Sequence, residues 1–275
     1  GEKPILLQTI EDLSTEVTED ELNEAFIDEW GVKYSKDGRK LLKAPQGLNG
    51  NYSVKVGTRI ICDDAFSKCS SLTSIVISNS VVSIGDGAFS GCTSLSSIVI
   101  PDSVPSIGDW AFSDCTSLSN IVIPNSVTSI GEGAFSSCTS LSNIVIPDSV
   151  TRIGNFAFSN CTSLSNIVIS YSVTNIGDDV FYQCSSLTSV VIPNSVTCVG
   201  DEAFCKCRSL SNIVIPNSVT SIGVSVFWGC SSLVNMDIPD SVTRIGDWAF
   251  VNCSNLSYDL KQELISRFGD ELFKL

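Results

Sequence analysis

The protein is a chain of 275 residues with 30 acidic side chains, 16 basic ones, no histidine and a net charge of −14. This acidic balance lacks the cationic surface that binding to nucleic-acid phosphates requires, so we expect no nucleic-acid partner. The lack of histidine removes the Ser–His and Cys–His pairs of nucleophilic catalysis, and no phosphate-binding glycine loop occurs, so we expect a non-enzymatic protein without a cofactor.

Residues 1–50 predict an N-terminal cap made of a helix and a β-hairpin. Thr18 and Glu21 form a capping box, which marks the start of a helix. We expect this helix to end at Gly31, and residues 34–41 (YSKDGRKL) to form a hairpin around their Asp-Gly turn. The apolar residues that would share one face of the helix are Leu22, Ala25, Phe26 and Trp30.

Residues 51–257 repeat one phrase at a fixed interval of 23 residues. In each repeat a phenylalanine precedes a cysteine by three residues, and a leucine follows that cysteine by three. A period of this length without insertions predicts a solenoid of about nine coils, in which each coil contacts only its neighbours. The cysteines of the series are Cys69, Cys92, Cys115, Cys138, Cys161, Cys184, Cys207, Cys230 and Cys253.

The repeat LSNIVIPNSVTSIGEGAFSSCTS predicts the path of one coil. Residues 118–123 alternate like a short strand, and Pro124 ends it because proline lacks a backbone donor. Residues 127–130 predict a second extended stretch. We expect Gly131 to adopt a backbone conformation closed to other residues, and residues 132–138 to form a short helical or 3-10 turn.

The cysteine series admits three interpretations. We favour a column of free thiols at one inward corner of the coils, because free cysteine behaves as a small buried hydrophobe. Disulfides between adjacent coils and a metal site are the alternatives. Of the 12 cysteines, those outside the column are Cys62, Cys198 and Cys205.

The pattern LxxIxIPxxVxxIGxxAFxxCxx resembles the BspA-like leucine-rich repeat family, over about residues 52–257. The resemblance implies an α/β-type solenoid, a right-handed coil with a parallel β-sheet on one face and short helical or 3-10 turns on the other. Departures include Cys62 in place of a glycine and Met236-Asp237 in place of an Ile-Val pair. Residues 258–275 predict a helical C-terminal cap, whose inward residues would be Leu260, Leu264, Ile265, Leu272 and Phe273.

The strand residues between the inward ones predict a flat, uncharged strip on the sheet face. Valine is a good strand former on a half-exposed surface, which would explain the strip without any ligand. Contiguous apolar strips also mark interaction sites, and this second interpretation predicts a ligand-binding face. The ligand-binding residues that it predicts are Asn120, Val122, Asn143, Val145, Asn166, Val168, Ser189, Val191, Asn212 and Val214.

A column of mostly acidic residues opens the turn segment of each coil. Stacked carboxylates could collect Ca²⁺, but Asn155 and Val224 interrupt the acids. We therefore favour N-capping of the turns, and we predict no metal site. The members of the column are Asp63, Asp86, Asp109, Glu132, Asn155, Asp178, Asp201, Val224 and Asp247.

Aromatic residues decorate the otherwise uniform coils. Aromatics are frequent at interfaces and can stack on sugars, but these are too scattered in the sequence to define a site, and we interpret them as surface variation. They are Trp110, Phe156, Tyr171, Tyr182, Trp228 and Trp248.

The resemblance implies a recognition module, since BspA-like proteins are associated with adhesion to extracellular-matrix proteins and with cell aggregation. We therefore expect a secreted or cell-surface protein whose sheet face binds a protein, such as one of the extracellular matrix, or a glycan. A structural spacer within a larger surface protein is the alternative. No apolar run is long enough to span a membrane, and the chain begins at Gly1 rather than methionine, so we expect any export signal to have been removed.

Overall fold

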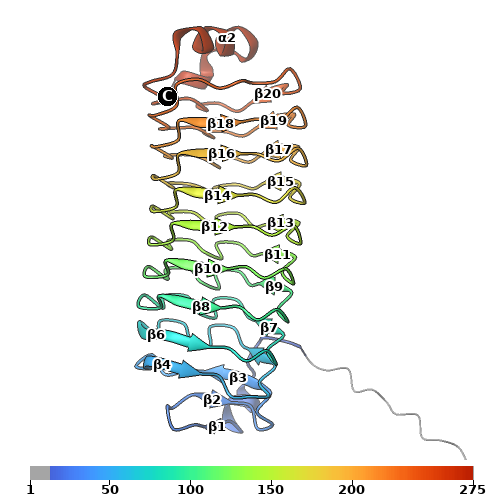
Figure 1. The fold of residues 1–275 in the computed structure, drawn as a ribbon, viewed down its shortest axis with the longest axis vertical. Coiled ribbons are helices and arrows are strands. Elements are labelled where there is room, and N and C mark those ends of the chain that lie inside the picture. The colour runs from blue at the N-terminus through green and yellow to red at the C-terminus, as the bar shows by residue number, and fades with distance from the viewer. Residues whose placement is uncertain (1–12, 275) are drawn as a thin grey trace, which may run out of the picture.

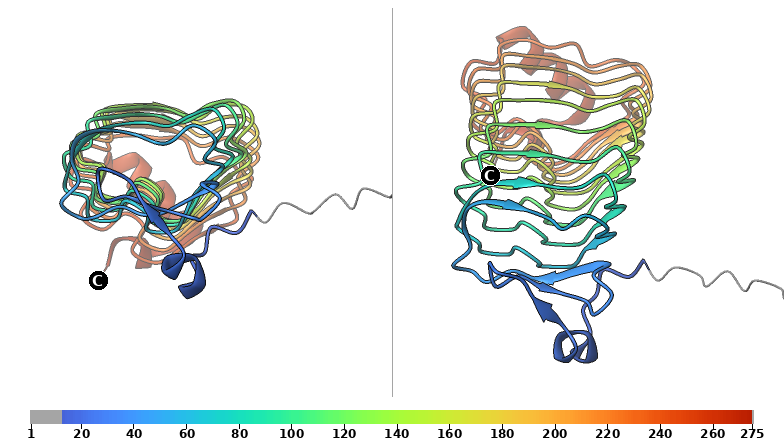
Figure 2. Two further views of the ribbon diagram at one scale, coloured as in Figure 1. Left: turned by 90° about the horizontal axis from the view of Figure 1, so that it is seen from below. Right: turned by 60° about the horizontal axis from the view of Figure 1, so that its bottom comes forward.

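The computed structural model describes residues 13–274, and its backbone winds into a stack of similar coils (Figure 1). The N-terminal elements lie at one end of the stack and a C-terminal helix lies at the other. Viewed along the stack, the coils superpose closely around a common interior (Figure 2). This is the predicted solenoid.

One side of the stack is built from short strands that pair in parallel between successive coils. The register is 23 residues, as in the pairing of Ile121 with Ile98 and of Val145 with Val168. This confirms the predicted parallel sheet. Its strands are β4 (Asn49–Ser53), β6 (Ser71–Val76), β8 (Ser97–Val99), β10 (Asn120–Val122), β12 (Asn143–Val145), β14 (Asn166–Val168), β16 (Ser189–Val191) and β18 (Asn212–Val214).

The second extended stretch of each coil forms another parallel ladder, as in the pairing of Ile130 with Ile107 and Ile153. Proline or serine two residues after the preceding strand starts the tight turn between the two stretches. In one such turn, Val127 N donates to Pro124 O at 3.0 Å. The strands of this ladder are β3 (Lys40–Lys43), β5 (Ile60–Ile61), β7 (Ser83–Ile84), β9 (Ser106–Ile107), β11 (Ser129–Ile130), β13 (Arg152–Ile153), β15 (Asn175–Ile176), β17 (Cys198–Val199), β19 (Ser221–Ile222) and β20 (Arg244–Ile245).

The remaining side of each coil consists of tight turns. The sequence predicts a short helical or 3-10 segment there. Alternate backbone N–H groups there bond within and between coils. Ser113 N donates within its coil to Trp110 O at 3.0 Å, whereas Phe112 N donates to Ala134 O of the next coil at 2.8 Å. A continuous helix does not form because half of these donors are used to join coils. The backbone is in the left-handed region at Trp110 and Asp114, which have φ of 57° and 58°.

The interior contains a continuous stack of phenylalanine rings. Adjacent rings have centroids 5.2–5.9 Å apart. Tyr52 and Phe273 extend the stack at its two ends, each 5.9 Å from the neighbouring ring. The predicted inward orientation is confirmed for Phe66, Phe89, Phe112, Phe135, Phe158, Phe181, Phe204, Phe227 and Phe250, all of them buried.

The glycine that follows the second extended stretch is required because a side chain there has no space between the coils. The predicted reason, a backbone conformation closed to other residues, is wrong. Gly131 does not have a positive φ, but a Cβ there would lie 2.5 Å from Asp109 Oδ1 and 2.6 Å from Asp109 N. Asp109 Oδ1 accepts a hydrogen bond from Glu132 N of the next coil at 2.7 Å. The acidic column therefore joins coils through backbone N–H groups, and the predicted capping of its own turn is replaced by this contact. Cys62 is tolerated at the glycine position of the first coil, where it packs with Leu42 and Ile60.

The N-terminal end contains the predicted capping box and hairpin. Helix α1 (Glu19–Asn23) begins after Thr18, whose hydroxyl accepts from Glu21 N, while the Glu21 carboxylate accepts from Thr18 N. Strand β2 (Lys33–Tyr34) pairs antiparallel with β3 across the turn at Gly38, which has φ of 74°. Strand β3 then starts the second ladder of the solenoid by pairing in parallel with β5.

The predicted helix extending to Gly31 is wrong. The chain leaves α1 and forms β1 (Phe26–Ile27), which pairs antiparallel with β2. Between these strands the Asp28 carboxylate accepts from the backbone N–H groups of Trp30 and Val32, each at 2.9 Å. This local side-chain bonding satisfies backbone donors in a turn, which is how aspartate competes with helix formation.

The C-terminal end is covered by α2 (Tyr258–Phe268) and η1 (Asp270–Phe273). Leu260 and Leu264 are buried as predicted, and Ile265 is half-buried. The tail after α2 continues the backbone bonding between coils, because Phe250 N donates to Leu272 O at 2.9 Å. Within residues 13–274, no helix combines the length and the apolar character needed to cross a membrane.

Candidate recognition face

From β6 to β18, the valine in the last position of each strand of the first ladder projects into solvent, where it remains 49–76% exposed. Period-two alternation explains this placement: in β12, Ile144 is buried whereas Asn143 and Val145 are exposed. The outward orientation agrees with the sequence prediction. The aligned side chains, which we call the valine strip, are Val76, Val99, Val122, Val145, Val168, Val191 and Val214.

A polar column runs beside the valine strip. Asn166 Nδ2 donates to Asn143 Oδ1 at 3.3 Å, so part of the column is hydrogen-bonded along the stack. The neighbouring Ser165 hydroxyl also donates along the stack, to Ser142 O at 3.2 Å. These bonds hold the polar side chains in register with the valines. The predicted residues Asn120, Ser189 and Asn212 are exposed in the same column.

The face is hollowed where the strand ladder is interrupted, between β10 and β12 and again between β14 and β16. Each interruption carries an open depression of about 330 Å³. The floor and walls of each depression come from two adjacent coils. The valine strip is therefore an uneven surface as well as an apolar one. Lining side chains include Val122, Asn143, Val145 and Pro147 in the first depression, and Val168, Tyr171, Val191 and Pro193 in the second.

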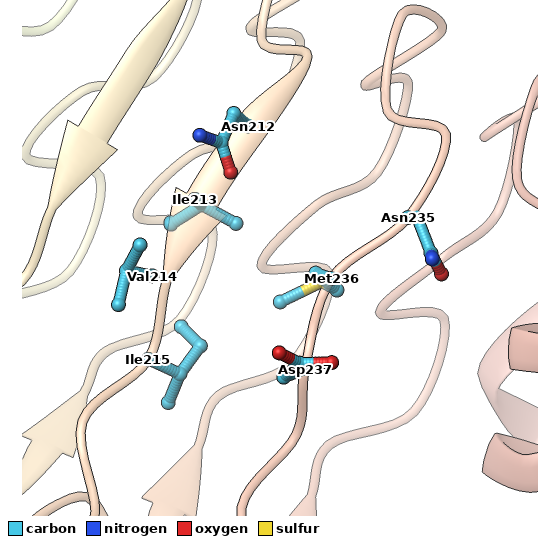
Figure 3. A pocket seen from close by; sticks show the side chains of 7 residues that line it. All are labelled: Asn212, Ile213, Val214, Ile215, Asn235, Met236 and Asp237. Carbon is cyan, nitrogen blue, oxygen red and sulfur yellow. The ribbon is translucent and has the colours of Figure 1, made fainter.

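A further depression, of about 300 Å³, lies at the C-terminal end of the strip (Figure 3). Here Met236 takes the inward position and Asp237 takes the place of a valine, as the sequence departure indicated. Figure 3 shows Asp237 on the coil next to that of Val214, with Asn212 and Asn235 at the start of the same two segments. The apolar strip thus ends at a carboxylate.

The charged groups bordering the valine strip are acidic. Asp102, Asp148 and Asp240 are exposed in the turn that follows the strand, and Asp237 is exposed at the end of the strip. A strongly anionic ligand would be repelled by these carboxylates. The electrostatics therefore favour a neutral partner or one with basic groups around an apolar centre.

The cysteine column is a structural part of the core. Cys138 Sγ donates to Phe112 O of the preceding coil at 3.2 Å, and the same contact recurs along the column. All twelve cysteines are free. Burial raises the pKa of Cys161 to about 12, so its thiol stays neutral near physiological pH. Within the described residues, no group of three His, Cys, Asp or Glu side chains is placed to hold a metal ion.

We expect a thiol reagent to distinguish the exposed cysteine from the column. At about pH 8, iodoacetamide should label Cys198, which is partly exposed, and leave Cys161 unmodified because its raised pKa keeps the thiolate population low. Mass spectrometry before and after unfolding in guanidinium measures this difference. Rapid labelling of Cys161 in the folded protein would contradict the buried column.

The structure brings together aromatic residues that the sequence left scattered. Trp110 and Phe156 lie 46 positions apart in the chain, yet their ring centroids are 6.4 Å apart. Gly133, in the coil between them, leaves room for the indole. The repeat register of the sequence could have indicated this contact, because it places Trp110, Gly133 and Phe156 in one column. A second cluster on the same side contains Tyr182, Lys206 and Trp228.

The stacked parallel strands, the recurring inward leucines and the exposed strip define a leucine-rich repeat solenoid. The chain belongs to the BspA-type leucine-rich repeat family, whose repeat region matches residues 59–188 and 174–275 in six copies. Leucine-rich repeat domains generally mediate protein binding, and repeat proteins of this type are generally non-enzymatic. A comparison with curated proteins gave no match.

Among solved structures, the chain is similar to a leucine-rich repeat protein from Bacteroides ovatus, at 31% identity and a TM-score of 0.70 over 84% of this chain and 67% of that one. It is similar to a leucine-rich cell surface protein from Faecalibacterium prausnitzii at 31% identity and a TM-score of 0.48, covering 80% and 63%. A leucine-rich repeat protein of T. pallidum is 25% identical with a TM-score of 0.51, covering 88% and 91%. The chain thus spans about two thirds of the length of the first two.

Proposed function

We propose that this chain is a recognition module of a secreted or cell-surface protein and that it binds protein partners through the valine strip. The observation that carries the proposal is the alignment of exposed valines, each 49–76% accessible, along one face of the stack. Monomeric proteins rarely expose contiguous apolar surface of this kind without using it for an interaction. The depressions at Val145 and Val168 give the face the relief that a partner's side chains could fill.

The border of the strip narrows the class of partner. Acidic groups such as Asp102 and Asp148 surround an uncharged centre, which supports a protein with an apolar patch and basic groups, including one of the extracellular matrix. The near-identity of the coils favours an extended or repetitive partner over a small molecule in a tailored pocket. Membership of the BspA-type family supports the surface location and an adhesive role.

Replacing Val145 and Val168 together with glutamate should abolish binding to extracellular-matrix proteins while leaving the fold intact. Both side chains are about 60% exposed, so the new carboxylates remain hydrated. They would, however, place charge at the centre of the apolar contact, where desolvation is costly. Surface plasmon resonance against a panel of matrix proteins measures the binding, and circular dichroism during thermal unfolding measures the fold.

A matched control is the Thr151→Glu/Thr174→Glu double variant. Both threonines are exposed outside the strip, so the variant adds the same charge elsewhere on neighbouring coils. It should bind like the wild-type protein. Equal loss in both variants would indicate a general charge effect, and unfolding of the valine variant would show that those valines support the core.

A structural spacer is the second candidate function. The uninterrupted phenylalanine stack from Phe66 to Phe250, closed by Tyr52 and Phe273, makes a rod without a break in its core. Such a rod could hold other domains apart at a set distance. Failure of the wild-type protein to bind any member of the matrix panel would favour this role.

A further inference from the structure

The turn side of the solenoid carries three bulky aromatics, Trp110, Phe156 and Trp248, in a backbone conformation that disfavours them. Trp110 and Phe156 have φ of 57° and 59°, and the equivalent residues in other coils include Gly87 and Gly133. A large side chain at positive φ is a strained choice, which persists only when the surroundings stabilise it or function requires it. Glycine is available to this repeat, so the aromatics at these positions call for a separate explanation.

Trp110 and Phe156 form one surface because Gly133 lies in the coil between them. A Cβ at Gly133 would lie 2.3 Å from Trp110 Cε3 and Cζ3, so the indole occupies the space that a side chain there would take. The indole thereby reaches across one coil toward Phe156, with the ring planes inclined by 28°. Trp110 nevertheless remains 40% exposed. The pair is a partly exposed aromatic surface.

Polar groups continue the same column beyond Phe156. The next two members are Asp179 and Glu202, which interact electrostatically. Desolvation, followed by the charge of Glu202, raises the pKa of Asp179 to about 6. These carboxylates offer hydrogen-bond acceptors beside the aromatic pair.

A second aromatic pair lies three residues further along these coils, around a lysine. Lys206 Nζ donates to the Tyr182 hydroxyl at 2.6 Å and lies 4.9 Å from the Tyr182 ring and 5.4 Å from the Trp228 ring. Lys206 also interacts electrostatically with Glu202, which connects this cluster to the acidic column. Aromatic faces, carboxylates, a phenol and an ammonium therefore gather on one side of neighbouring coils.

We propose that this side of the solenoid is a binding site for a neutral glycan, separate from the valine strip. The C–H faces of successive sugar rings pack on the pair of Trp110 and Phe156 and, several coils further along the stack, on Trp228. The hydroxyls of the rings between bond to Asp179, Glu202 and Lys206. An anionic glycan would be repelled by the carboxylates. A cationic ligand would compete with Lys206, which already lies over the aromatic rings of the second cluster. A polyhydroxylated, uncharged ligand matches both the donors and the acceptors.

The test is binding of the full chain to an array of neutral plant, fungal, bacterial and mammalian glycans, with heparin as an anionic probe. The Trp110→Gly/Trp228→Ser variant uses residues found at equivalent positions of the repeat, Gly87 and Ser90, and relieves the positive φ at Trp110. It should keep or raise the Tm and weaken glycan binding by at least about tenfold.

Tyr171→Asn is the matched control, because it removes a 73% exposed aromatic outside the site and restores the residue found at Asn125. This control and the Val145→Glu/Val168→Glu variant should bind glycan like the wild-type protein. The proposal is overturned if the wild-type chain binds no neutral glycan, if it binds heparin alone, or if the Trp110→Gly/Trp228→Ser variant binds unchanged. Loss of glycan binding in the valine variant alone would assign the glycan to the valine strip.

Discussion

Replacing Phe158 with alanine should destabilise the protein by about 3–5 kcal/mol, one of the largest effects available to a single substitution in this chain. Phe158 is fully buried, and its ring lies 5.5 Å from that of Phe135 and 5.8 Å from that of Phe181. Truncation would leave a cavity between two coils whose backbones are held by hydrogen bonds, so collapse around it is limited. Urea unfolding followed by circular dichroism measures the loss.

Phe156→Ala is the matched control, because it makes the same replacement two residues earlier in the chain. Phe156 is half-buried, has a left-handed conformation and contacts Trp110, so its removal should cost no more than about 1.5 kcal/mol. Because coils are coupled through nearest neighbours, Phe158→Ala should also broaden the unfolding transition by weakening the middle of the stack. Equal stability of the two variants would refute the placement of the phenylalanine column in the core.

Gly131→Ala should destabilise the protein by about 1–3 kcal/mol or more, because the added methyl group has no space. Its Cβ would lie 2.5 Å from Asp109 Oδ1 and 2.6 Å from the Asp109 backbone nitrogen. Either the two coils separate or the bond from Glu132 N to Asp109 Oδ1 is lost. The free energy of unfolding, measured in urea, reports the effect.

Gly47→Ala is the matched control, and it should change the free energy of unfolding in the opposite direction. No atom lies within 4 Å of a Cβ built at Gly47, and its φ is outside the left-handed region, so alanine should stabilise the protein by about 0.4–1 kcal/mol through the unfolded chain. A Gly131→Ala variant that is as stable as Gly47→Ala would show that the coils tolerate a wider spacing than the structure has.

The helix predicted to reach Gly31 illustrates where a local pattern misleads. Apolar spacing at Phe26 and Trp30 fitted a helical face, but the Asp28 carboxylate bonds to two backbone N–H groups and turns the chain into β1 and β2. Phe26 then stacks on Tyr34, with centroids 5.3 Å apart. Asp28 supplies the local part of this outcome, but the pairing of β1 with β2 and the ring of Tyr34 lie outside residues 22–31, so that segment alone does not reveal them.

The acidic column illustrates a different limit. Its residue types suited both N-capping and calcium binding, since both use carboxylate oxygens. In the structure Asp86 Oδ1 accepts from Asp109 N of the next coil at 2.7 Å, a bond between residues 23 positions apart. Neither interpretation included this contact, because the capping hypothesis considered each turn by itself and the calcium hypothesis considered only the carboxylates.

The repeat pattern is enough to predict the coil, its parallel register and the orientation of its residues, because a period of 23 residues with eight recurring apolar positions has one way to bury them all. The tertiary structure alone decided why Gly131 is needed, how Asp109 is used, and which surface residues meet, such as Trp110 and Phe156. The cause is the same in each case. These contacts join residues of different coils, and such residues come within a few ångströms of each other only when the coils stack.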